Sequence, residues 1–112
     1  MEFAMTPDIP REVQLLAEFQ ATFCRVLGNP QRIMILWLLA EKERTVSEIA
    51  LGIGTSLQNT SQHLRIMGFN NLVEFRREHH NIYYHLAEND LTKKCLVFTN
   101  RPKDIHLEIS PI

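Results

Sequence analysis

The stretch at residues 45–86 limits the possible folds of this chain most strongly, because helix-start signals there are followed by two strand-like runs. Thr45 is followed three residues later by Glu48, and this capping box predicts the start of a helix. Two glycines then permit a sharp bend, after which Thr55 or Ser56 can cap a second helix. The pattern therefore predicts two short helices joined by a tight turn.

The second of these helices, expected from about Leu57 to Met67, separates its residues into two faces. The expected packed stripe comprises Leu57, Thr60, Leu64 and Met67. The polar face comprises Gln58, Ser61, Gln62 and Arg65. Glutamine can pair with adenine, serine with several base edges, and arginine with guanine or phosphate, so this face suits DNA contact. An ordinary solvated helix face is the alternative interpretation.

Two residues of this helix carry further alternatives. Gln58 would complete a second capping box if Thr55 were the N-cap, and its side chain would then turn back onto the helix. His63 lies off the polar face, so we expect it to pack against the protein rather than contact DNA.

Two alternating runs rich in β-branched and aromatic residues follow, after an asparagine pair that can end the helix in a left-handed conformation. The runs are 72–77 and 82–86, and residues 78–81 join them. This pattern predicts a β-hairpin with a basic, histidine-rich tip. Arg76 and Arg77 would contact the DNA backbone or minor groove without reading individual bases. A solvated hairpin tip is the alternative interpretation.

The region before this stretch, residues 10–40, is also predicted to be helical. Residues 10–27 are apolar on two sides of a helix, which requires two partners, namely the chain's own core and a second subunit. Asn29 and Pro30 cap and start a central helix, because proline suits the first helical position. Residues 33–40 of that helix are uninterruptedly apolar, so we expect Trp37 in the core unless it lines a pocket.

The order of these elements is that of a winged helix-turn-helix, which places one helix in the DNA major groove and a hairpin against the backbone. We predict a mainly α fold with a small β-hairpin, in the order α-α-α-α-β-β-α. The last helix is expected from Glu88, and Pro102 prevents it from continuing far. The domain spans 10–101, between an extension at 1–9 and a strand-like tail at 102–112. We expect this tail to dock on an exposed edge or on the partner subunit, and disorder is the alternative.

Length and composition fit one small domain. With 112 residues and 45% hydrophobic content, the chain buries a smaller share of its surface than larger domains do, so dimerisation would add burial. A net charge of -1 and a pI near 6.5 are unlike a strongly basic DNA-binding protein, so any positive field must be local. No apolar run approaches a membrane span and no signal peptide is evident, so we expect a cytoplasmic protein.

Several motifs, in this order and spacing, are similar to those of the ArsR/SmtB family of bacterial and archaeal repressors. They are 27–36 (LGNPQRIMIL), 45–49 (TVSEI), 61–65 (SQHLR), and 76–78 (RRE) with 82–86 (IYYHL). The resemblance covers most of the chain. It implies a homodimer built on the first and last helices, which binds double-stranded DNA at a palindromic operator and is released by a metal, metalloid or redox signal.

The chain departs from the metal-sensing members of that family. Where arsenic- and cadmium-sensing members carry a pair of cysteines, Thr45 and Ser47 are hydroxyl residues, whereas soft metals prefer thiolates. Where zinc-sensing members carry Asp, His and Glu ligands on the last helix, residues 89–100 offer only Asp90 as a ligand of that kind, and one carboxylate does not make a tetrahedral site. We therefore expect no metal and no cofactor. His79 stands where many relatives have glycine, and histidine at positive φ is strained.

Cys24 and Cys95 are the remaining candidates for a sensor. Each lies on an end helix, and the resemblance implies that these helices pack together, so a redox-sensitive disulfide within or between subunits is one hypothesis. Inert buried thiols, a persulfide switch and a metal site with nearby histidines are the alternatives. Dithiol-sensing relatives place their first cysteine where this chain has Trp37, which argues against direct analogy.

An enzyme is not expected, because the chain has no glycine-rich phosphate loop, no nucleophile elbow and no His-Glu metal helix. The competing hypothesis is a winged helix that binds other proteins without DNA. Such a module would carry apolar residues on the face at 58–65, whereas the polar face favours DNA. The residues predicted to contact DNA are Ser56, Gln58, Asn59, Ser61, Gln62, Arg65, Arg76, Arg77 and His79.

Overall fold

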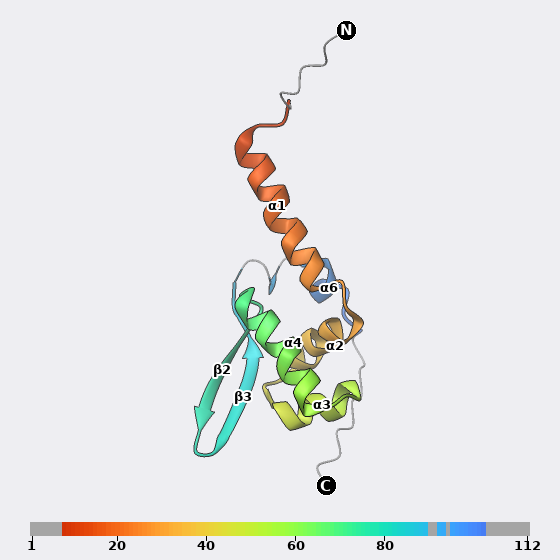
Figure 1. Cartoon of the computed structure of the whole chain (residues 1–112), viewed down its shortest axis with the longest axis vertical. Coiled ribbons are helices and arrows are strands. Elements are labelled where there is room, and N and C mark those ends of the chain that lie inside the picture. The colour runs from red at the N-terminus through yellow and green to blue at the C-terminus, as the bar shows by residue number, and fades with distance from the viewer. Residues whose placement is uncertain (1–7, 90–91, 94, 103–112) are drawn as a thin grey trace.

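The computed structural model describes residues 8–89, 92–93 and 95–102 (Figure 1). Its elements are α1 (Arg11–Val26), α2 (Pro30–Glu41), β1 (Arg44–Thr45), α3 (Val46–Ile53), α4 (Leu57–Phe69), β2 (Val73–Glu78), β3 (Asn81–Leu86) and α6 (Leu96–Thr99). The predicted winged helix-turn-helix is confirmed. Asp90 and residues 103–112 of the predicted tail lie outside the described residues, as do residues 1–7 of the predicted extension.

Helix α2 forms the centre of the core. A proline occupies its first turn, and the Asn29 side chain caps it by accepting hydrogen bonds from the backbone N–H groups of Gln31 (2.9 Å) and Arg32 (3.2 Å), as predicted. Trp37 is half-buried, and its indole N–H donates to the Val97 carbonyl oxygen at 3.0 Å. The buried core cluster includes Ile35, Leu36, Leu38, Ile49, Leu64, Met67 and Leu72.

The caps of both helices of the helix-turn-helix follow the prediction, and at α4 the structure selects one of the two residues expected to cap it. Thr45 Oγ1 accepts from the Glu48 N–H at 3.2 Å and Glu48 Oε1 accepts from the Thr45 N–H at 3.4 Å, so the predicted capping box is present. At α4 the N-cap is Ser56, whose Oγ accepts from the Asn59 N–H at 3.0 Å. The alternative capping box starting at Thr55 is therefore wrong.

Helix α4 continues to Phe69, beyond the predicted end at Met67. It ends where Asn71 adopts a φ of 61°, as expected for one residue of the asparagine pair. The Leu72 N–H then donates to the Met67 carbonyl oxygen at 2.9 Å, which closes the end of the helix.

Helix α1 extends away from the rest of the described structure, as Figure 1 shows. Only its last turn joins the core, through Phe23, Val26 and the following Leu27. Leu16 and Phe19 remain 53% and 52% exposed. The prediction that one side of the whole helix packs on the chain's own core is therefore wrong for all but this last turn.

The last helix is shorter and more interrupted than predicted. Asn89 Oδ1 accepts from the Thr92 N–H at 3.1 Å and starts a short helical turn, but Cys95 is not helical and α6 covers only Leu96–Thr99. The Thr92 hydroxyl donates to the Ala87 carbonyl oxygen at 2.6 Å, and such side-chain bonds to the backbone compete with regular helix. A continuous helix from Glu88 is therefore wrong.

The sheet contains a strand that the sequence pattern did not predict. Strand order is β1-β3-β2, and β1 pairs antiparallel with β3 through Arg44–Tyr84 and Thr45–Tyr83. Arg44 is 3% exposed and donates from Nε to the Leu38 carbonyl oxygen at 3.2 Å. A second bond from its Nη2 to Glu41 Oε2, at 3.0 Å, pairs its charge.

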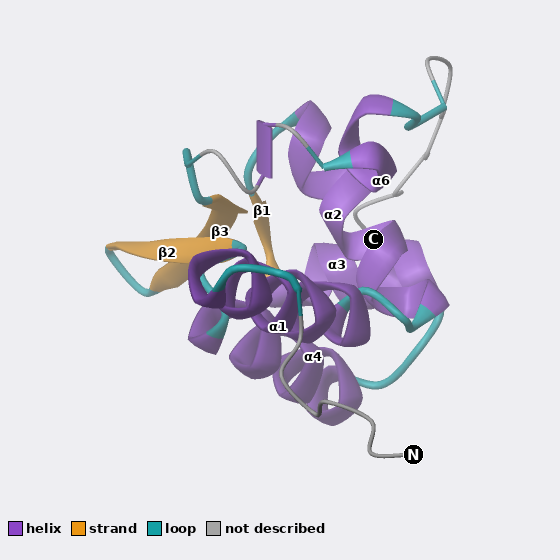
Figure 2. Ribbon diagram, turned by 90° about the horizontal axis from the view of Figure 1, so that it is seen from above, coloured by secondary structure: helices purple, strands orange, loops and turns teal. Residues whose placement is uncertain are grey.

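The β2–β3 hairpin projects from one side of the helices (Figure 2). Its register runs from Val73–Leu86 to Glu78–Asn81, which leaves a two-residue turn at His79 and His80. His79 has a φ of 57°, the strained left-handed conformation anticipated at this position. In the described part of the chain, none of the helices is long and apolar enough to cross a membrane.

Candidate nucleic-acid interface

The two faces of α4 are arranged largely as predicted. Thr60, Leu64 and Met67 are buried at 0%, 1% and 0% exposure. Leu57, predicted in the same stripe, is 56% exposed, because it is the first residue of α4 and packing begins one turn later. The exposed side chains of the opposite face are Gln58, Ser61, Gln62 and Arg65.

A shallow hollow of about 360 Å³ lies at the start of α4 and is lined by Ser56, Gln58, Asn59 and Gln62. The structure thus brings four of the predicted DNA-contacting residues together. Two of them also form hydrogen bonds within the protein. The Ser56 hydroxyl caps α4. Asn59 Nδ2 donates to Thr55 Oγ1 at 2.9 Å and to Gln31 Oε1 of α2 at 3.0 Å.

A groove of about 590 Å³ separates α4 from the hairpin. Ser61 and Arg65 line it from α4, and Glu74 and Phe75 line it from β2. The polar face of α4 and the hairpin therefore border the same groove, an arrangement that lets a winged helix-turn-helix approach bases and the neighbouring backbone together.

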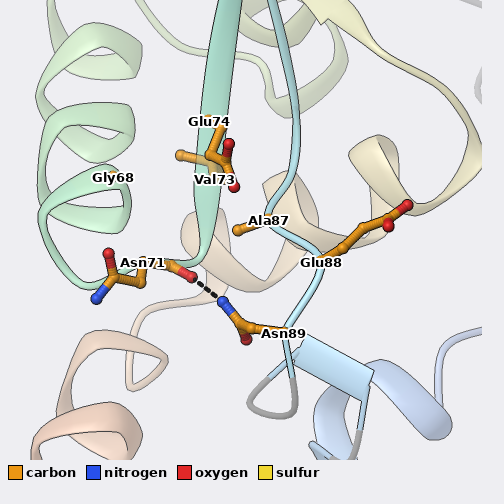
Figure 3. A pocket seen from close by; sticks show the side chains of 7 residues that line it. All are labelled: Gly68, Asn71, Val73, Glu74, Ala87, Glu88 and Asn89. Atoms are coloured by element: carbon orange, nitrogen blue, oxygen red, sulfur yellow. Dashed lines mark hydrogen bonds between the residues drawn. The ribbon is translucent and has the colours of Figure 1, made fainter.

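Figure 3 shows a separate pocket behind the base of the hairpin, between the end of α4 and the segment after β3. Asn89 Nδ2 donates to the Asn71 carbonyl oxygen at 2.9 Å across it. Glu74 and Glu88 also line it, so its charged groups are acidic and unsuited to phosphate. It contains none of the residues predicted to contact DNA.

Arg76 and Arg77, for which we predicted the same role, differ in their contacts. Arg76 reaches across β3, where its guanidinium carbon lies 4.7 Å from the centre of the Tyr83 ring, and its Nε donates to Glu43 Oε2 at 2.9 Å. It also forms ion pairs with Glu43 and Glu78. The hydrogen bond from Arg76 lowers the pKa of the Glu43 carboxyl. Arg76 is therefore held by two carboxylates.

Arg77 and His79 are exposed on the hairpin. The Arg77 guanidinium carbon lies 5.9 Å from the centre of the Phe75 ring. Within the described ranges, Arg77 takes part in no ion pair. It is therefore better placed than Arg76 to meet a phosphate.

His63 is buried and packs against α2, as predicted. Its Nδ1 accepts from Arg32 Nε at 3.2 Å, and its Nε2 lies 2.8 Å from Gln31 Oε1. Because an arginine can only donate, Nδ1 must be the acceptor and Nε2 must carry the proton. Burial, and then the nearby Arg32 charge, lower the pKa of the imidazole. Sequence reasoning missed both Gln31 and Arg32, because only the tertiary fold brings them to α4.

Both cysteine thiols are free; Cys24 is exposed on α1 and Cys95 is buried. Over residues 8–89, 92–93 and 95–102, no group of three or more His, Cys, Asp or Glu side chains is arranged to hold a metal ion. The Thr45 hydroxyl, at one of the positions discussed for soft-metal ligands, is engaged in the cap of α3.

Comparison with known proteins agrees with this geometry. Residues 29–74 match the model of the bacterial regulatory protein, arsR family. The nodulation protein NolR of Rhizobium meliloti is 37% identical over 93 residues, which cover 83% of this chain and 75% of NolR. This chain belongs to the ArsR family. It is therefore a DNA-binding transcriptional regulator.

Two further similarities bear on the architecture. The transcriptional repressor SmtB homologue of Synechocystis is 36% identical over 73 residues, which cover 65% of this chain but only about half (55%) of that protein. The homodimeric winged helix-turn-helix DNA-binding domain of a possible ArsR-family regulator from Mycobacterium bovis superposes with a TM-score of 0.65 and 36% identity, covering 80% of this chain and 82% of that domain.

The neutral His63 predicts a specific pH dependence of stability. Because its pKa in the folded protein is lowered from the ordinary value of 6.5, the unfolded chain binds a proton first as pH falls, and the free energy of unfolding decreases below that value. We expect the parent protein to lose more stability than His63→Gln between about pH 7.5 and about pH 5.5 in urea titrations. The control is His80→Gln, which removes one imidazole at an exposed position. Equal losses in parent and His63→Gln would contradict this assignment.

Proposed function

We propose that this ArsR-family chain is a homodimeric repressor that binds a palindromic operator with α4 in the major groove and the hairpin on the adjacent backbone. The observation that carries the proposal is the exposed polar face of α4, which borders one groove with the hairpin. A protein-interaction module would present apolar side chains on this face, so its polarity supports DNA rather than a protein partner.

We assign the base contacts to the exposed polar face of α4. Gln58, Ser61 and Gln62 would lie near base edges, and Arg65 would reach a base or a phosphate. Ser56 and Asn59 stand at the start of the helix, where backbone contacts are typical. On the hairpin, Arg77 and His79 would meet the phosphate backbone. Arg76 would do so only by exchanging its carboxylate partners for phosphate.

The homodimer is supported by the uncovered apolar side of α1. The half-exposed apolar residues on and just before this helix leave substantial apolar surface in water unless a partner covers them. The similar domain from Mycobacterium bovis is homodimeric. A second copy of this chain is therefore the proposed partner, with the two α4 helices about 34 Å apart to match one turn of DNA. The half-exposed residues are Ile9, Val13, Leu15, Leu16 and Phe19.

We further propose that the chain lacks the metal-sensing sites of its relatives and that any signal acts through a thiol. The hydroxyl residues at 45 and 47 disfavour a soft metal. Cys24 is the thiol that an oxidant reaches, because it is exposed, whereas Cys95 is buried.

The DNA-binding assignment is tested by selecting duplexes from a random library and measuring affinity for the selected and for random DNA. Gln62→Ala should cost about 1–3 kcal/mol on the selected duplex and little on random DNA. Arg77→Ala should weaken both alike, and Arg77→Lys should lose less because it keeps the charge. Failure to enrich any duplex would favour the protein-interaction module, and equal losses for Gln62→Ala would exclude its role as a reader.

The dimer interface is tested by placing a charge on the apolar side of α1. Leu16→Glu should shift the protein from dimer to monomer in sedimentation equilibrium, because the carboxylate would be buried between subunits. Ala21→Glu places the same charge on another side of the helix and should leave the dimer intact. A dimeric Leu16→Glu, or a monomeric parent, would contradict the interface.

The thiol hypothesis is tested with hydrogen peroxide, which oxidises accessible thiolates. Oxidant should lower the affinity of the parent for its selected duplex, and thiol reductant should restore it. Cys24→Ser should keep its affinity under oxidant, while Cys95→Ser should respond as the parent does. If Cys24→Ser loses the duplex as fully as the parent, the response does not run through that thiol.

A further inference from the structure

We propose that Gln31, on α2, is a positioning residue for DNA recognition: its side-chain oxygen holds Asn59 and His63 of α4 and so sets the rotation of the recognition helix. This inference rests on the proposed DNA-binding role of α4. Gln31 is half-buried at the edge of that helix.

The contacts join Gln31 to two successive turns of α4. Gln31 Oε1 accepts from Asn59 Nδ2 at 3.0 Å and lies 2.8 Å from His63 Nε2, which carries the ring proton. Asn59 and His63 are four residues apart, so they stand one above the other on the same edge of the helix. A helix held at two points along one edge cannot roll about its axis without breaking one of the two bonds.

Gln31 is itself anchored. Its backbone N–H donates to Asn29 Oδ1 at 2.9 Å in the capped first turn of α2. The next residue, Arg32, binds the other ring nitrogen of His63 at 3.2 Å and donates from Nη1 to the Val26 carbonyl oxygen at 3.1 Å. Adjacent residues of α2 therefore form hydrogen bonds with both nitrogens of the imidazole, and the same turn of α2 is hydrogen-bonded to the end of α1.

The consequence for DNA concerns discrimination rather than overall affinity. Asn59 lines the hollow that also contains Gln58 and Gln62. Bidentate contacts between glutamine and a base require a helix orientation held to within about 10–20°. Phosphate contacts from the flexible Arg77 tolerate a larger rotation. Loss of the Gln31 oxygen should therefore reduce the preference for the selected duplex while leaving random DNA binding nearly unchanged.

The test uses Gln31→Met, which keeps the length of the side chain and removes the acceptor. We expect the ratio of affinities for selected over random DNA to fall by about tenfold, which corresponds to one lost net hydrogen bond of about 1–1.5 kcal/mol. Asn59→Ala removes one of the two bonds to the Gln31 oxygen and should lower the ratio by a smaller factor. The double variant should lose no more of the ratio than Gln31→Met, because the two substitutions share that bond.

A second readout separates positioning from general destabilisation. In the parent, nitrogen NMR shifts of His63 should show the proton on Nε2, and Gln31→Met should weaken that preference because the acceptor is gone. If Gln31→Met does not fold, Asn59→Ala decides through the affinity ratio. A ratio of affinities that is unchanged by the substitution, even where both affinities fall equally, would overturn the inference. Failure of the parent to select any duplex would refute the proposed function instead.

Discussion

The packing of α4 against α2 is the interaction on which the rest of the structure depends. Leu64 and Met67 of α4 join Ile35 and Leu36 of α2 in one buried cluster. Because a helix can bury only one stripe, this contact decides which side chains of α4 remain in water. The exposed polar face is therefore a consequence of the core, and the hydrogen bonds of Gln31 adjust its rotation at the edge of that apolar contact.

The electrostatics of the interface are local. The whole chain carries a net charge of -1, so attraction to DNA must come from the few cations on the presenting side. The structure reduces that number further, because Arg76 is paired with Glu43 and Glu78. In the proposed interface, Arg65 and Arg77 carry the phosphate attraction, which implies a small number of released counterions for each subunit and a modest dependence on salt.

The features that could be predicted from sequence are those decided within a few residues. The Thr45–Glu48 capping box and the Asn29 cap are local patterns whose partners lie three or fewer residues away, and both form as expected. The alternating hairpin runs are local as well, and they pair in the register that their spacing requires.

The features that could not be predicted depend on distant partners. Arg44 is buried in a two-residue strand whose partner lies on β3, and so short a strand has no periodicity of its own. Arg76 is tied to Glu43, 33 positions away, because the sheet order places β2 on one side of β3 and β1, which Glu43 precedes, on the other. Gln31 belongs to the same class: nothing in its local pattern distinguishes it from an ordinary residue in the first turn of a helix.

The attachment of α1 determines how a dimer could present its two recognition helices. Within the part of the chain that the structure describes, α1 reaches the core through its last turn, with Val26 and the following Leu27, and Arg32 adds a bond to the Val26 carbonyl oxygen. If two copies associate through the apolar side of α1, the spacing between their α4 helices is set by the rigidity of this one turn. The same Arg32 side chain holds His63. The residue that bonds the end of α1 therefore also bonds α4. In the proposed dimer, the half-site spacing and the rotation of α4 would depend on this one side chain.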